Sequence, residues 1–113
     1  MATSEPVFAG GAFSVLTEAH AGVRIVRTFG EIDIANAKLL EREIRSAFDS
    51  DAEAVLLDLA EVGFIDAIGL CVLLAAMMLS SAKGHGLRIV RLSSPVQRAI
   101  EVSGLDRAFP LVD

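Results

Sequence analysis

The residues best placed to do chemistry in this sequence are Asp66 and Gly69, at the predicted start of an apolar helix. Aspartate is a favoured N-cap residue, because its carboxylate can accept a backbone N–H from the first helical turn. Such a helix end also offers free N–H groups and a partial positive charge, which suit an anion or a polar group of a partner protein. From local spacing alone we interpret Asp66 as an ordinary cap, with binding as the alternative.

Other combinations that could support catalysis or bind a metal lack a supporting motif. A Ser-His-Asp arrangement can be assembled from Ser80 or Ser81 with His85 and Asp106, but no nucleophile-elbow pattern surrounds either serine. His20 and His85 lie far apart, and with a single cysteine the chain has no spacing typical of a zinc site. We therefore predict no enzyme activity, no cofactor and no metal site.

The composition is that of a folded, globular protein with one domain. A chain of 113 residues is long enough for a single core. Its 53% hydrophobic and 22% charged residues are typical of a globular protein. The net charge of −5 opposes attraction to a phosphate backbone, and there is no Trp or Tyr to stack on bases. Nucleic acid is therefore excluded as the expected partner.

The central apolar run also bears on location. Residues 68–79 form a run of about twelve apolar residues, shorter than the roughly eighteen that a membrane span needs. The first residues lack the basic and apolar regions of a secretory signal. Cys71 lies within this run and is predicted to be buried as a small hydrophobic residue, as are Met77 and Met78. We predict a buried helix, no membrane insertion and a cytoplasmic protein.

The first half of the chain predicts a hairpin followed by a helix. Residues 1–11 are small and polar and are assigned to a flexible lead-in, ahead of two antiparallel strands at 13–18 and 23–29 with a turn between them. Asp33 is placed to cap a helix over 34–49. Apolar residues recur in that helix at spacings of three or four: Ala37, Leu40, Ile44 and Phe48.

The second half predicts alternating strands and helices. Residues 54–59 form an almost continuous apolar run typical of a strand buried on both faces, followed by a tight loop and the central helix to about residue 82. A strand at 87–92 leads through Pro95 into a helix at 96–103 that Gly104 ends. Residues 109–112 could add a last strand. This order predicts an α/β fold: a mixed sheet of four to five strands with helices mainly on one face.

The central segment resembles the STAS domain, the fold of bacterial anti-sigma-factor antagonists. The resemblance rests on an apolar strand with Asp58 followed by Phe64-Ile65-Asp66-Ala67-Ile68-Gly69-Leu70. It extends upstream to Gly30-Glu31-Ile32-Asp33 and downstream to Val96 through Leu105. It implies that residues 12–113 form a single STAS domain.

The resemblance implies a function as well as a fold. A STAS antagonist binds an anti-sigma factor of the histidine-kinase-like ATPase type, frees a sigma factor and so regulates transcription. The implied partner-binding residues lie at the helix start and in the preceding loop: Glu31, Asp33, Asp66, Ala67, Ile68 and Gly69. The alternative within the family is an accessory subunit of a lipid transporter or of a sensory scaffold complex.

The chain departs from the family pattern at two positions of that helix start. Where antagonists of this type carry a phosphorylated Ser or Thr, this sequence has Ala67, followed by the bulky Ile68. Ala67 has no hydroxyl, so we predict that no phosphorylation switch operates there. If Ile68 faces solvent, it exposes apolar area that suggests a changed partner preference and would also permit a homodimer through the docking face.

Overall fold

The structure is a computed structural model that describes residues 2–3, 7–8, 13–83 and 86–104. Its elements in chain order are β1 (Ala2–Thr3), β2 (Val7–Phe8), β3 (Ser14–His20), β4 (Val23–Ile32), α1 (Ala37–Phe48), β5 (Ala54–Ile65), α2 (Ala67–Lys83), β6 (Gly86–Leu92) and α3 (Ser94–Ser103). Within the predicted lead-in, β1 and β2 pair antiparallel with β3. The strand predicted at 109–112 lies outside the described residues.

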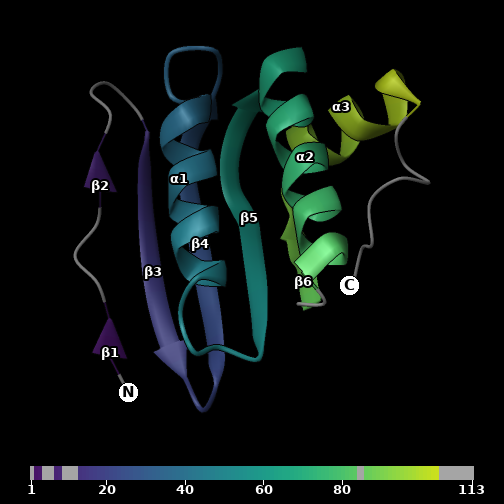
Figure 1. The fold of residues 1–113 in the computed structure, drawn as a ribbon. Coiled ribbons are helices and arrows are strands. Elements are labelled where there is room, and N and C mark those ends of the chain that lie inside the picture. Colours follow the sequence, from purple (N-terminus) through teal and green to yellow (C-terminus); the bar gives the residue numbers. More distant parts are fainter. Residues whose placement is uncertain (1, 4–6, 9–12, 84–85, 105–113) are drawn as a thin grey trace.

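The strands form one mixed sheet in the order β1-β3-β4-β5-β6. β3 and β4 are antiparallel, as predicted, whereas β4, β5 and β6 run parallel. Parallel neighbours need a crossover connection, and α1 and α2 supply the two crossovers. Both helices cover the same face of the sheet, while α3 packs against β5 (Figure 1). The predicted α/β class and mixed sheet are confirmed.

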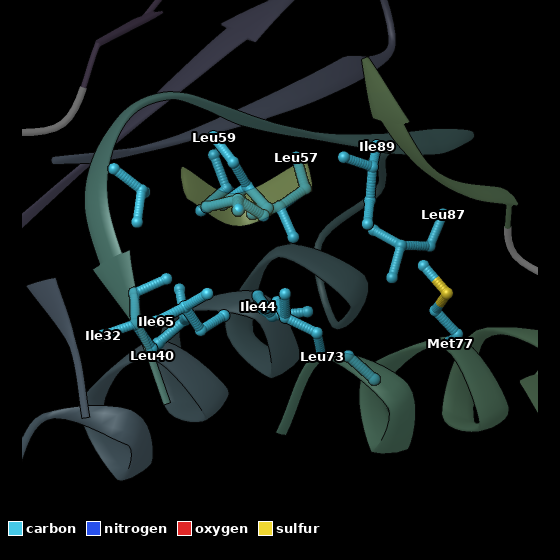
Figure 2. Packing of buried hydrophobic residues seen from close by; sticks show 14 of the residues in the cluster. Ile32, Leu40, Ile44, Leu57, Leu59, Ile65, Leu73, Met77, Leu87 and Ile89 are labelled. Carbon is cyan, nitrogen blue, oxygen red and sulfur yellow. The ribbon is translucent and has the colours of Figure 1, made fainter. Parts of the chain in front are cut away.

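The core lies between the sheet and the two crossover helices. Figure 2 shows Ile44 of α1 and Leu73 of α2 in this layer, together with Leu57 of β5 and Ile89 of β6. Each of these four side chains is at most 1% exposed. Fully burying a side chain of this size contributes roughly 1.5–3 kcal/mol, so this layer is the main source of stability.

β5 is longer than the predicted strand at 54–59. It continues without a loop to Ile65, because β4 also extends and offers backbone partners: Gly30 pairs with Val62 and Ile32 with Ile65. Two register shifts in the β4–β5 ladder accommodate the extra length. The predicted tight loop was therefore wrong, since strand pairing with a distant segment outweighed the weak strand preference of Gly63.

α2 is buried on one side only, which corrects the prediction of a buried helix. Leu73 and Met77 are buried, but Cys71 is exposed and Met78 is 67% exposed. The sequence is apolar around the whole helix, so its pattern could not show which side would face solvent. Cys71 and Met78 were wrongly assigned to the core. No helix among the described residues is long and apolar enough to cross a membrane.

A row of charged side chains crosses the sheet, with one residue from each of the strands β3, β4, β5 and β6. Arg27 of β4 donates from Nε to Glu18 of β3 and from Nη1 to Oδ2 of Asp58 in β5, at 3.1 Å for the second contact. Arg91 of β6 lies 3.9 Å from the same Asp58 oxygen. The hydrogen bond from Arg27, with a second from His20, holds the pKa of Glu18 below its ordinary value.

Candidate partner-binding site

The predicted site residues come together at one edge of the sheet. β4 and β5 are parallel, so their carboxyl ends lie side by side, at the upper end of the sheet in Figure 1. The backbone N–H of Asp66 donates to the carbonyl of Ile32 at 3.1 Å. This bond joins the start of α2 to the segment containing Glu31 and Asp33. The two stretches that the sequence singled out separately therefore form one surface.

Asp66 caps α2, as predicted. Its Oδ1 accepts the backbone N–H of Gly69 at 2.9 Å, and its carbonyl accepts the N–H of Leu70 at 3.0 Å. The carboxylate thus satisfies an N–H that has no partner within the helix and lies at the positive end of the helix dipole. Because this bond fixes the first turn, it also fixes the positions of the residues between Asp66 and Gly69.

Gly69 holds the first turn of α2 directly against the two strands. An added Cβ would lie 2.7 Å from both Ile32 Cγ2 and Ile65 Cγ1, and 3.1 Å from the backbone oxygen of Ile32. No side chain fits there without a shift of buried atoms. Gly69 is itself buried, so it shapes the site from below while the preceding residues face outward.

Asp33 closes a turn and does not cap a helix over 34–49. Its Oδ1 accepts the N–H of Ala35 at 2.9 Å, and its carbonyl accepts the N–H of Ala37, where α1 begins. An aspartate that bonds the backbone two residues ahead forms an Asx turn, which competes with capping. The predicted helix start was therefore three residues too early.

Asn36 is a site residue that the sequence reasoning missed. It is 7% exposed, its Nδ2 donates to the carbonyl of Glu31 at 2.6 Å, and its Oδ1 accepts the N–H of Asp33 at 2.9 Å. This side chain fastens the turn to the end of β4. The only available signal was an asparagine three residues after Asp33, a spacing equally typical of an ordinary turn.

The surface formed at this edge combines carboxylates with exposed apolar side chains. Glu31 and Ala67 are exposed, Asp33 and Asp66 are partly exposed, and Ile68 is 44% exposed. Two further apolar residues of the same edge were not among the predicted binding residues: Ile34, at 74% exposure, and Phe64, at 47%. For Ile34 a usable signal existed, since it is an isolated apolar residue within a turn sequence. Such clustered apolar exposure marks interaction sites more often than scattered residues do.

Neither metal binding nor an enclosed catalytic pocket distinguishes this edge. Within the described ranges, no three His, Cys, Asp or Glu residues are grouped so that they could hold a metal ion. The arrangement can instead present hydrogen-bond acceptors, negative charge and apolar area to another macromolecule. We call the outward-facing residues the docking surface: Glu31, Asp33, Asp66, Ala67 and Ile68.

Comparison with known families agrees with this geometry. The sequence model of the STAS domain matches residues 14–113. The chain belongs to the STAS domain family. The family resemblance found in the sequence is thereby confirmed.

Anti-sigma factor antagonists from several bacteria are similar to this chain. An anti-sigma F factor antagonist of Paenibacillus polymyxa is 32% identical over 97 residues, which cover 85% of this chain and 83% of the relative. The anti-sigma-F factor antagonist RsfB of Mycobacterium tuberculosis is 33% identical over 94 residues, which cover 81% of this chain and 75% of the relative. The crystal structure of an anti-sigma factor antagonist from Mycobacterium paratuberculosis aligns with a TM-score of 0.77 and 34% identity. The alignment covers 88% of this chain and 85% of the chain in that structure.

Proposed function

We propose that this STAS domain is an anti-sigma factor antagonist. It binds an anti-sigma factor of the histidine-kinase-like ATPase type, releases a sigma factor and acts in the cytoplasm as a binding protein without catalysis of its own. The family and the names of relatives more than 30% identical over most of the chain support this role. The observation that carries it is the bond between Asp66 and Ile32, which joins the turn after β4 and the start of α2 into one exposed surface.

The docking surface suits a protein partner with basic and apolar groups. Glu31, Asp33 and Asp66 bring three carboxylates to one edge, and Ile68 adds an exposed apolar side chain beside them. Complementary charge speeds encounter and sets orientation, whereas a buried apolar anchor slows dissociation. Gly69 and Asn36 contribute indirectly, because they hold the two halves of the surface in register.

Ala67 makes this antagonist insensitive to phosphorylation at the first residue of α2. A phosphate there would add about −1.5 to −2 charges to a surface that already carries three carboxylates. The exposed methyl group of Ala67 cannot accept one. The protein therefore remains competent to bind its partner at all times, unless another site regulates it.

A pull-down from extracts of the source organism tests the function and the surface together. We expect the wild-type chain to recover an ATPase-type anti-sigma factor, identified by mass spectrometry, and Ile68→Glu to lose it because the variant adds charge where apolar contact is needed. Met78→Glu is the matched control: it alters another exposed apolar residue of the same helix, 67% exposed and away from the first turn. Equal recovery by all three proteins would reject the surface. Recovery of transporter subunits instead would reject the function.

Restoring a hydroxyl at position 67 tests the loss of the switch. We expect Ala67→Ser to accept phosphate from the purified anti-sigma factor in the presence of ATP, and its binding to weaken by about tenfold or more once modified, because charge is added beside Asp66. The wild-type chain under the same conditions should gain no phosphate and keep its affinity, as followed by mass spectrometry and calorimetry. A serine variant that is never modified would contradict the proposed switch position.

A further inference from the structure

A groove lies between the end of β5 and one side of α3, next to the docking surface. Its volume is about 430 Å³, and its lining is mostly apolar: Phe64, Ile65, Pro95, Ala99 and Val102, with Arg98 as its cation. Ile65 directly precedes the cap residue Asp66. The groove therefore opens at the same edge of the sheet as the docking surface, where α3 lies beside the upper end of β5 in Figure 1.

The side of α3 that lines the groove differs from the side that holds the helix in place. Val96 and Ile100 are at most 1% exposed and pack in the core. Arg98 and Val102 lie one turn apart on the groove side, where Val102 is 82% exposed. Phe64, on the opposite wall, is 47% exposed. Two apolar side chains thus face solvent across one groove, and clustered apolar exposure of this kind marks interaction sites.

The groove is rigidly positioned relative to the docking surface. Ser93, the N-cap of α3, donates from its Oγ to the carbonyl of Val62 and from its backbone N to the carbonyl of Leu59, at 3.2 Å for the second bond. These bonds fasten the start of α3 to the second half of β5. Since β5 continues into Asp66, one strand connects the groove to the docking surface.

The charges of the two regions are opposite, and this indicates what the groove receives. Glu31, Asp33 and Asp66 are acidic, whereas Arg98 is exposed and lines the groove. We propose, on the basis of the proposed function, that the groove is a second contact for the anti-sigma factor and receives an apolar segment that carries an adjacent carboxylate. A second copy of this chain fits less well, because its docking surface would bring three further carboxylates against those already present.

Calorimetric titration with the anti-sigma factor recovered in the pull-down tests this proposal. We expect Arg98→Glu and Val102→Asp each to raise the Kd by about tenfold or more, because the first repels the carboxylate and the second makes the apolar wall polar. Arg98→Lys should rescue binding to within about threefold, since it keeps the charge. Arg88→Glu, at an exposed arginine of β6 outside the groove, is the matched control and should leave the Kd unchanged.

The outcomes separate this proposal from the function on which it rests. If the wild-type chain binds and Ile68→Glu does not, but both groove variants keep the wild-type Kd, the groove contact is overturned and the antagonist function stands. If the wild-type chain itself does not bind, both fall. Sedimentation of the wild-type chain and of each variant alone measures the oligomeric state. If the wild-type chain forms a dimer that the groove variants dissociate, a second copy of this chain occupies the groove, and the proposal is overturned. Unfolding midpoints equal to that of the wild type exclude misfolding as the cause.

Discussion

Gly69→Ala is expected to destabilise the protein by about 2 kcal/mol, even though alanine is the better helix former by about 1 kcal/mol. The new methyl group would lie 2.7 Å from two buried isoleucine side-chain atoms and 3.1 Å from a backbone oxygen. Ile32 is completely buried and 6% of Ile65 is exposed, so neither side chain can turn away into solvent. The first turn of α2 must move instead, and the cost of that movement outweighs the gain in helix propensity.

Urea unfolding followed by circular dichroism measures this effect, and Gly63→Ala is its matched control. Both substitutions add one methyl group, but nothing lies within 4 Å of a Cβ at Gly63. The control should therefore be neutral or stabilise the strand by roughly 0.5–1 kcal/mol, because it reduces the freedom of the unfolded chain. We also expect Gly69→Ala to weaken partner binding, since Ala67 and Ile68 move with the turn. Equal stability of the two variants would show that the contact at Gly69 is not tight.

Asp58→Ala is expected to cost about 3 kcal/mol, because it removes a carboxylate that accepts a hydrogen bond from Arg27 and forms a longer ion pair with Arg91. The Asp58 side chain is 8% exposed and lies 3.1 Å from Arg27 Nη1 and 3.9 Å from Arg91 Nε. Its other carboxylate oxygen accepts the N–H of Ala60 at 3.0 Å. Without the carboxylate, Arg27 keeps only its contact with Glu18, and a backbone N–H near the register shift loses its partner.

Glu41→Ala provides the comparison for this ion pair. On α1, Oε1 of Glu41 lies 3.8 Å from Nη2 of Arg45, and the two side chains are 42% and 56% exposed. An exposed helical pair of this kind contributes only a few tenths of a kcal/mol. Asp58→Asn then separates the effect of the charge from that of packing, since asparagine keeps the size of the side chain and one acceptor oxygen. This variant should lower the free energy of unfolding by less than Asp58→Ala does. If Asp58→Ala were no worse than Glu41→Ala in urea unfolding, the charged row across the sheet would contribute nothing measurable to stability.

Local pattern was sufficient wherever a single segment determined its own structure. The hairpin before α1, the cap at Asp66, the proline in the first turn of α3 and its end at Gly104 were predicted from neighbouring residues, and the structure confirms them. The bonding partners at the caps lie three or four residues apart, and a short turn joins the two hairpin strands, so sequence spacing indicates these contacts. The order of strands and helices, together with the central motif, was likewise sufficient for the family.

Contacts between distant segments decided the rest, because no local pattern reports them. β5 continued past residue 59 because β4 was there to pair with it, and Asp33 turned the chain because Asn36 could fasten that turn to β4. α2 is apolar on every side, so its own sequence could not show that Cys71 and Met78 would face solvent.

The site divides in the same way. The sequence by itself determined the family and the cap at Asp66, since these depend on a short motif. Tertiary structure alone decided that this turn lies against the end of β4 and that Phe64 and α3 form a groove beside it, because long-range packing brings those residues together.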